Sequence, residues 1–125
     1  NRVLEKEGEH LITGVCEQDN ANYPDCREEF ILSQQETINE AIGKMGDLNI
    51  QIHTPLMYLS KAESIDLAKT LDGCMEALAF SHTCYSGVYP PCGDCHSCVL
   101  RAEGFKQAGI ADPLIERSIG EKQYA

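Results

Sequence analysis

The sequence predicts an α/β fold in which part of a parallel sheet is followed by a helical segment that holds a metal ion. Two observations predict the sheet: an apolar run at residues 10–15, typical of a strand buried on both faces, and an alternating strand pattern at residues 48–52. The third observation is a group of four cysteines between residues 84 and 98, whose spacing is typical of a metal site.

Length and charge limit the classes of function. At 125 residues the chain can form one domain with a hydrophobic core. Its formal charge of −10 argues against gripping nucleic acid through phosphates, although a locally basic pocket can still hold a small anion. No apolar run approaches the roughly 20 residues that span a bilayer. The chain starts with Asn1 rather than Met, and we expect it to begin inside a larger fold.

A polar loop rich in turn-forming residues follows the first strand and runs from Cys16 to Arg27. Open α/β sheets place ligands beyond the carboxyl ends of their strands, so this loop is a candidate binding site. Tyr23 could stack on a planar ring, Asp25 could bind donor groups, and Arg27 could meet a carboxylate or phosphate. The structural alternative is equally open: Tyr23 packs, Asp25 caps the next helix, and Arg27 is a surface charge. Cys16 and Cys26 are predicted to be free thiols.

A helix is predicted over residues 27–44, where apolar residues recur every three or four positions and two glycines mark the end. Its apolar face includes Phe30, Ile31, Ile38, Ala41 and Ile42. The alternating strand at residues 48–52 follows, and His53 is predicted to be a strand-end residue rather than a catalytic one.

Ser60 and Glu63 form a capping-box pattern, which predicts a helix that continues to about Leu71, with Gly73 past its end. Lys61 lies in the first turn, close to amides that attract anions, and a Lys there opposes the helix dipole unless an anion or carboxylate neutralises it. Lys61 is therefore a candidate phosphate ligand, and the alternative is a solvated lysine beside Glu63. Residues 74–80 predict a further short helix.

The cysteine cluster consists of Cys84, Cys92, Cys95 and Cys98 in the pattern C-x7-C-x2-C-x2-C. Four thiolates around one Zn²⁺ give the closed tetrahedral sphere of a structural site, which is the favoured interpretation. Disulfides are an alternative, but the chain shows no signal peptide, and we expect a cytoplasmic protein with reduced thiols.

An iron–sulfur cluster also accepts C-x2-C-x2-C, yet the usual ferredoxin run adds a fourth Cys followed by Pro, where this chain has Val-Leu-Arg. His96 could replace one sulfur, although four cysteines already fill the shell. Residues after Cys98 predict a helix closed by Gly109, whose N-terminal amides would face the thiolates, with Arg101 in its first turn. A last helix is predicted from Asp112-Pro113 to about residue 119.

Several motifs occur in an order that resembles one enzyme family, over residues 10 to about 106. They are Gly14-Val15-Cys16-Glu17, Tyr23-Pro24-Asp25-Cys26-Arg27-Glu28-Glu29-Phe30, Thr54-Pro55-Leu56-Met57, Lys61-Ala62-Glu63 and the cysteine cluster with Leu100-Arg101. Together they resemble the 7-cyano-7-deazaguanine synthases, the zinc-containing ligases of queuosine-precursor synthesis. The set is highly specific, although the cluster is the only motif that is specific by itself.

The resemblance implies a Rossmann-like parallel sheet of the adenine nucleotide alpha hydrolase-like type, here an incomplete portion, with a C-terminal helical zinc-binding segment. Residues 1–80 would be the C-terminal part of the nucleotide-binding α/β domain, and residues 81–125 the zinc-binding segment. The implied activity is that of an ATP-dependent carbon–nitrogen ligase, which converts 7-carboxy-7-deazaguanine and ammonia to 7-cyano-7-deazaguanine. One structural Zn²⁺ per chain is implied, with ATP and Mg²⁺ as substrate.

The same resemblance implies that Tyr23, Asp25 and Arg27 face the deazapurine and that Lys61 meets ATP phosphates. Its catalytic residues stay unassigned. We expect small-molecule partners, no nucleic acid and no membrane, and we leave a homodimer open.

The chain departs from the family pattern in two respects: the Ser-Gly-Gly-x-Asp-Ser phosphate loop does not occur in its 125 residues, and neither does the first half of the sheet. We therefore expect that these residues do not hold ATP on their own. Two other functions compete, namely a non-catalytic zinc module or divergent defence-system relative, and a sulfur-transfer relative acting on tRNA, which the acidic charge disfavours. Nitrile formation from ATP, ammonia and the carboxylate separates these hypotheses.

Overall fold

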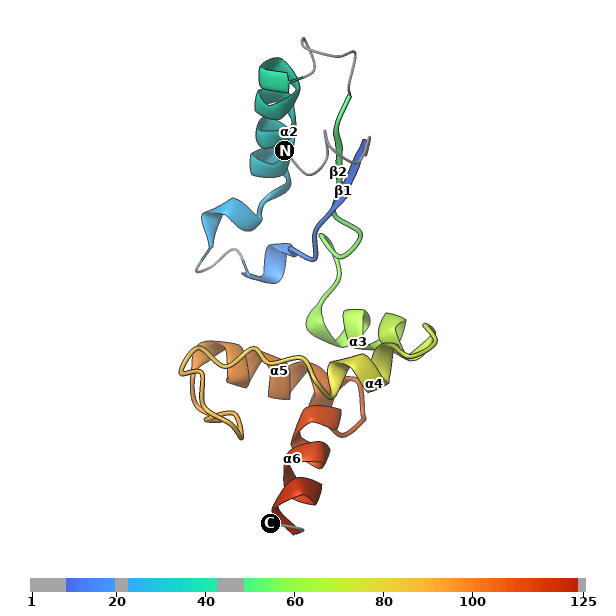
Figure 1. The fold of residues 1–125 in the computed structure, drawn as a ribbon, viewed down its shortest axis with the longest axis vertical. Helices are drawn as coiled ribbons and strands as arrows, with labels where there is room; N and C mark the ends of the chain where they lie inside the picture. The colour runs from blue at the N-terminus through green and yellow to red at the C-terminus, as the bar shows by residue number, and fades with distance from the viewer. Residues whose placement is uncertain (1–8, 20–22, 43–48, 124–125) are drawn as a thin grey trace. The chain divides into compact units, whose positions relative to one another are not determined.

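The computed structural model describes residues 9–19, 23–42 and 49–123, which form two compact units (Figure 1). The units comprise residues 1–59 and residues 60–125, whereas the predicted boundary lay between residues 80 and 81. Residues 60–80 group with the cysteine-rich segment because helix α3 (Lys61–Lys69) packs against helix α5 (His96–Gln107). Within the described residues, none of the helices combines the length and apolar character needed to cross a bilayer.

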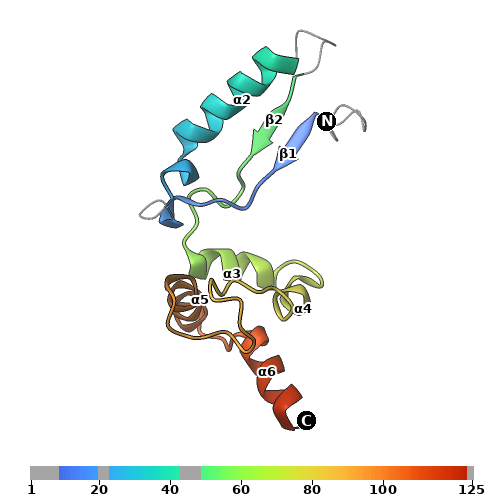
Figure 2. The same ribbon diagram turned by 60° about the vertical axis from the view of Figure 1, so that its left-hand side comes forward.

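The first unit is built around two parallel strands, β1 (His10–Ile12) and β2 (Gln51–His53), in which Leu11 pairs with Ile52. Between them the chain forms two 3-10 turns and one α-helix: η1 (Glu17–Asp19), η2 (Pro24–Cys26) and α2 (Glu28–Ile42). The parallel pairing and the strand–helix–strand order confirm an α/β fragment, which Figures 1 and 2 show. Two paired strands do not by themselves show a Rossmann-like sheet, so that finer fold class stays a prediction.

Helix α2 contacts the backbone of the β2 segment through two amide side chains. The Asn39 side chain donates to the Ile50 carbonyl at 2.9 Å and accepts from the Ile50 N–H at 2.7 Å. The Gln35 side-chain oxygen accepts from the Ile52 N–H at 2.7 Å. Gln51 instead donates its backbone N–H to Glu9, on the side of β1. Backbone groups of alternate residues point to opposite strand edges, so α2 satisfies the edge that β1 leaves unused.

The first strand is more exposed than its sequence predicts. Leu11 is 43% and Ile12 72% exposed, so the expectation of burial on both faces is wrong. Phe30 and Leu32 of α2 are also exposed, and α2 has no buried residue. The described residues of this unit supply two strands and one α-helix, which leaves no second layer to cover the apolar run. Among the residues of this unit that the structure describes, Cys16, Ile50 and Met57 are buried.

The alternating pattern of the second strand is confirmed where the structure describes it. Ile50 is buried and Ile52 half-buried, while Gln51 between them is exposed. Three sequence features lie outside the described residues: the N-terminal stub at residues 1–8, the predicted helix end at residues 43–46, and Leu48.

The second unit consists of helices α3, α4 (Cys74–Leu78), α5 and α6 (Pro113–Gln123) (Figure 2). A long loop between α4 and α5 carries Cys84, Cys92 and Cys95. The capping box is confirmed, because the Ser60 hydroxyl accepts from the Glu63 N–H while the Glu63 carboxylate accepts from the Ser60 N–H. Gly109 adopts a φ of +70° just after α5, a conformation that favours glycine, and so ends that helix as predicted. The core of this unit consists of Ile65, Ala68, Cys84, Cys98, Phe105 and Leu114.

Helices α3 and α5 lie close together at Gly104, which is buried in α5. A Cβ atom at this position would lie 2.8 Å from the Lys61 Cβ and 3.3 Å from the Ile65 Cδ1. Such distances are shorter than van der Waals contact, so any side chain at residue 104 would push the two helices apart. The absence of a side chain at Gly104 therefore sets the spacing between α5 and the first turn of α3.

Candidate functional site

The four predicted cysteine ligands come together in the second unit. Each offers its Sγ atom, and these atoms all lie within 4.8 Å of one another; the Cys92 and Cys98 sulfurs are 3.9 Å apart. Four sulfurs each about 2.3 Å from a zinc ion would lie roughly 3.8 Å apart in a tetrahedron. The cluster formed by Cys84, Cys92, Cys95 and Cys98 could therefore hold a metal ion, as the sequence predicts.

Local turns bring the sulfurs together. Cys95 is the N-cap of α5 and Cys98 lies in its first turn, so one helix start presents two of the four sulfurs. Gly93, between the second and third cysteines, has a φ of +81°, a left-handed conformation that side chains disfavour. The Cys95 N–H donates toward the Cys92 sulfur at 3.4 Å, which closes this turn. The C-x2-C steps therefore fold as the tight turns that metal binding requires.

The protein environment lowers the pKa of two of the four thiols and raises the pKa of the other two. A backbone hydrogen bond from Cys92 lowers the pKa of the Cys84 thiol to about 6, and one from Cys98 lowers the pKa of Cys95. Burial instead raises the pKa of Cys98 to about 12, and a hydrogen bond with the Asp94 side chain raises that of Cys92. A bound dication would offset these costs and hold all four sulfurs as thiolates.

The structure bears on three alternatives to a four-cysteine zinc site, namely disulfides, His96 as a ligand and an iron–sulfur cluster. None of the seven cysteines, all of which lie in the described residues, forms a disulfide. His96 is the first residue of α5 and is not a member of the cluster. Sulfurs this close together fit one four-coordinate ion better than a multi-iron cluster, in which the cysteines bind different irons and lie farther apart.

Arg101 does not serve as the predicted counter-charge in the first turn of the helix. It lies in the second turn of α5, where its guanidinium forms two bonds to the Asp112 carboxylate, at 2.5 and 2.8 Å. The same group donates to the Ser81 hydroxyl at 2.9 Å and the Leu78 carbonyl at 3.1 Å, and it lies 5.3 Å from the Phe105 ring centroid. Arg101 thus joins the end of α4, α5 and the start of α6.

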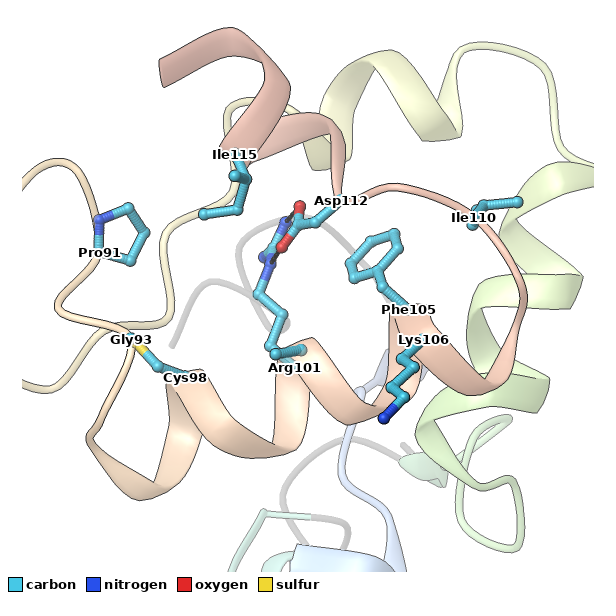
Figure 3. Close-up of a pocket in the computed structure, with 10 residues that line it drawn as sticks. Pro91, Gly93, Cys98, Arg101, Phe105, Lys106, Ile110, Asp112 and Ile115 are labelled. Carbon is cyan, nitrogen blue, oxygen red and sulfur yellow. Dashed lines mark hydrogen bonds and ion pairs between the residues drawn. The ribbon is translucent and has the colours of Figure 1, made fainter. Parts of the chain in front are cut away.

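Asp112 has a second role, since its carboxylate accepts from the Leu114 N–H at 2.9 Å and so caps α6 as predicted. Beside the Arg101–Asp112 pair lies a largely apolar cavity of about 300 Å³ (Figure 3). Its lining includes Pro91, Gly93, Cys98, Phe105, Ile110 and Ile115. The close-up shows the guanidinium and carboxylate facing each other next to the Phe105 ring. The pair is already saturated by its mutual bonds, so the cavity offers mainly an apolar surface.

The candidate substrate residues lie beyond the carboxyl end of β1, in the first unit. Tyr23 precedes η2 and is 43% exposed, Asp25 lies within η2, and Arg27 is its C-cap. Asp25 is therefore part of a 3-10 turn and does not cap α2, which begins at Glu28. All three residues are exposed.

Two of the resembling motifs meet at this edge of the sheet. The Thr13 N–H donates to the His53 carbonyl at 3.0 Å, and the Glu17 N–H donates to the Met57 carbonyl at 2.9 Å. The Tyr58 hydroxyl donates to the Glu28 carboxylate. The loops that follow β1 and β2 are therefore bonded to each other, as expected of loops at the carboxyl ends of neighbouring parallel strands.

Lys61, the candidate phosphate ligand, is the first residue of α3 and is half-buried. The neighbouring Glu63 carboxylate accepts from both the N–H and the hydroxyl of Ser60 at 2.8 Å. Those bonds lower the pKa of Glu63 and keep it ionised.

Some contacts at the strands could not be predicted from sequence. His10 Nδ1 and His53 Nε2 lie 2.9 Å apart, and the Tyr58–Glu28 bond joins residues far apart in the chain. Neither pair belongs to a recognisable spacing, and only the register of β1 and β2 brings the histidines together. His53 follows the prediction of a strand-end residue.

Comparison with known proteins identifies the family. The model of the family described as queuosine biosynthesis protein QueC matches residues 3–109. The chain belongs to the QueC family. A relative from Chromobacterium violaceum named 7-cyano-7-deazaguanine synthase is 52% identical over 114 residues, covering 91% of this chain and 47% of the relative.

Two further relatives carry the same name. The protein from Laribacter hongkongensis is 50% identical over 111 residues, covering 89% of this chain and 46% of the relative. The protein from Gloeobacter violaceus is 49% identical over 107 residues, covering 83% of this chain and 45% of the relative. This QueC chain therefore spans about half the length of the curated relatives it matches.

Proposed function

We propose that the intact QueC protein is an ATP-dependent ligase that converts 7-carboxy-7-deazaguanine and ammonia to 7-cyano-7-deazaguanine in queuosine biosynthesis. The observation that carries this proposal is an identity of 49–52% to three relatives named 7-cyano-7-deazaguanine synthase, over most of this chain. The motifs that suggest the same reaction lie within the region matched by the family model. The four-cysteine cluster is compatible with the zinc that the resemblance implies.

The reaction needs two activations, because neither a carboxylate oxygen nor an amide oxygen leaves readily. ATP first activates the substrate carboxylate, and ammonia attacks the acyl carbon to give an amide as the activated oxygen departs. A second ATP activates the amide oxygen, and its departure with loss of the nitrogen's protons leaves the nitrile. Such chemistry requires recognition of the base and of phosphates more than it requires general acids and bases.

Residues in each unit are assigned to these two recognition tasks. Tyr23 would stack on the deazapurine, Asp25 would accept hydrogen bonds from its donor edge, and Arg27 would pair with its carboxylate. Lys61 would meet ATP phosphates, whose charge Mg²⁺ also offsets. The exposure of Tyr23, Asp25 and Arg27 beyond a strand's carboxyl end supports the first assignment. The position of Lys61 at the start of α3 supports the second.

Zinc would be held by Cys84, Cys92, Cys95 and Cys98, whose four sulfurs would fill its coordination sphere. A zinc ion with four thiolates has no open position, so it supplies a structural cross-link rather than Lewis-acid chemistry. The cluster residues would tie the loop after α4 to the first turn of α5. We further propose a cytoplasmic protein without membrane or nucleic-acid partners; the formal charge of −10 supports the exclusion of nucleic acid.

The proposal is tested with the intact protein, ATP, Mg²⁺, ammonia and 7-carboxy-7-deazaguanine, with products followed by mass spectrometry. We expect the nitrile to form and to depend on both ATP and ammonia. A folded, zinc-loaded, intact protein that makes no nitrile would rule the proposal out.

Arg27→Ala tests the substrate assignment in the same assay. We expect a higher KM for the carboxylate substrate or a loss of rate, because the guanidinium would no longer pair with it. Arg117→Ala is the matched control, since Arg117 contacts the Phe80 and Tyr89 rings in the second unit. Wild-type kinetics for Arg27→Ala would leave Arg27 a surface residue.

A further inference from the structure

Two adjacent residues of the loop after β2 hold two separate parts of the loop after β1. The Met57 carbonyl accepts from the Glu17 N–H at 2.9 Å, just beyond the buried Cys16. The next residue, Tyr58, donates its hydroxyl to the Glu28 carboxylate at the start of α2. The polar loop from Cys16 to Arg27, which carries the candidate substrate residues, is thus attached to the loop after β2 at two places. Backbone atoms make the attachment near its beginning, and one side chain makes the attachment at its end.

The attachment at Glu28 reaches the candidate substrate residues directly. Glu28 follows Arg27, whose carbonyl accepts from the Ile31 N–H at 3.2 Å and so starts the helix. Before it, the Cys26 N–H donates to the Tyr23 carbonyl at 2.9 Å, which closes the 3-10 turn whose C-cap is Arg27, so residues 23–27 form one turn with its caps. A displacement of Glu28 would therefore move this turn and the Arg27 side chain with it.

Packing does not account for Tyr58. Its side chain is 65% exposed, whereas its neighbour Met57 is 2% exposed and fills the local core. An exposed tyrosine can contribute mainly through its hydroxyl, and this hydroxyl bonds to a carboxylate, which makes a stronger bond than a neutral acceptor. The Glu28 carboxylate raises the pKa of Tyr58 to about 12, so the hydroxyl stays protonated and able to donate at neutral pH.

We propose that Tyr58 is a positioning residue for substrate recognition, which holds the turn of residues 23–27 in place through Glu28 and so aims Arg27 at the substrate carboxylate. This inference rests on the proposed function, since it assigns the held turn to the deazapurine. Tyr58 itself touches no substrate in this scheme. Its loss should therefore weaken binding of the carboxylate substrate and leave the ATP steps unchanged.

The test is Tyr58→Phe in the intact protein, which removes the hydroxyl and keeps the ring. We expect KM for 7-carboxy-7-deazaguanine to rise about fivefold to tenfold, the effect of losing roughly one hydrogen bond to a charged group. The KM for ATP and kcat should stay within about twofold of wild type. Amide hydrogen exchange at Cys26 and Ile31 should become faster, because their bonds lie in the turn that has lost its attachment.

Four further variants distinguish the effect of the Tyr58–Glu28 hydrogen bond from other effects of changing Tyr58. Tyr89→Phe is the matched control, because the Tyr89 hydroxyl also bonds to a glutamate, Glu121, but in the second unit. It should leave KM and the exchange at Cys26 unchanged. Glu28→Ala should reproduce Tyr58→Phe, Glu28→Gln should restore most of the affinity by keeping an acceptor, and the double variant with Tyr58→Phe should be no worse than Glu28→Ala alone.

The outcomes distinguish this inference from the proposed function. If Tyr58→Phe shows wild-type exchange at Cys26 and Ile31, or an unchanged KM in a protein that forms the nitrile, Tyr58 is not a positioning residue. If the wild-type protein forms no nitrile, the proposed function fails on its own, and exchange still decides whether Tyr58 holds the turn.

Discussion

The two units of the chain bury their apolar residues to different degrees. In the second unit, Ile65, Phe105 and Leu114 form a core between helices, and the cysteine cluster could add a metal cross-link. In the first unit, Leu11 and Ile12 of a strand remain exposed, and the described residues that are buried lie at a few positions near the strand ends. Local sequence signals are strong in both units. The difference shows that the burial of a helix or strand depends on the elements that pack against it, and not on how strongly its own sequence predicts it.

Loss of a cysteine ligand should have the largest effect on stability, and this effect should fall on the second unit rather than the first. We expect Cys95→Ser to unfold much of the second unit, because structural zinc can contribute on the order of 10–16 kcal/mol to the folding of small zinc domains. Circular dichroism and zinc content measure the effect, and amide exchange of α5 against α2 shows where it falls. Cys74→Ser, outside the cluster, is the control and should keep its zinc. Native helicity and full zinc content in Cys95→Ser would contradict a structural metal.

Truncation of one leucine in each unit compares the two directly. Leu114 is 1% exposed, so Leu114→Ala should lower the free energy of unfolding by about 2–5 kcal/mol. Leu11 is 43% exposed, and Leu11→Ala should cost less than about 1 kcal/mol. Denaturant unfolding of both variants provides the measurement. Equal losses would mean that β1 is covered in the protein in solution.

Gly104→Ala tests the close approach of α5 to α3. The new methyl would meet the Lys61 Cβ at 2.8 Å, and we expect a loss of about 1–3 kcal/mol from the separation of the helices. Gly120→Ala is matched to it, since Gly120 lies in α6 with nothing within 4 Å of a new Cβ. The control should gain up to about 1 kcal/mol through helix propensity. A stabilised Gly104→Ala variant would show that the spacing is not set at this residue.

The capping box of α3 should give the smallest effect. Ser60→Ala should cost about 1 kcal/mol, because the Glu63 N–H loses its acceptor. Hydrogen bonds from Ser60 lower the pKa of Glu63, so its contribution is present at neutral pH and is lost as the pH falls through that lowered value. Thermal unfolding at neutral and acid pH measures both. An equal loss for Ser60→Ala at the two pH values would exclude the Glu63 half of the box.

Local features of the fold could be read from the sequence because their causes are local. Ser60 with Glu63, Gly109 after α5, and Asp112 before Pro113 each set a helix end within a few residues, and the structure confirms all three. The cysteine spacing likewise predicted a cluster that the structure brings together. In each case the partners lie close in sequence, or their residue types leave few other uses.

Features that depend on distant partners could not be read in this way. Arg101 was expected beside the sulfurs, yet Asp112 offers a bidentate partner that no spacing rule indicates. The Tyr58–Glu28 bond depends on two loops meeting beyond parallel strands. The exposure of Ile12 was missed because an apolar run reports what a strand can bury, and not what lies against it.

One consequence concerns helix α5, which has Cys95 and Cys98 at its start and Gly104 farther along. A helix rises about 1.5 Å per residue, so the cysteine end and the glycine contact lie roughly 14 Å apart on one stiff rod. Helix α5 therefore connects the cysteine sulfurs rigidly to the contact with Lys61. A shift of the end of α5 that carries Cys95 and Cys98 would displace the first turn of α3. Metal binding or loss at the cluster would therefore change the position of Lys61, which is not part of the cluster.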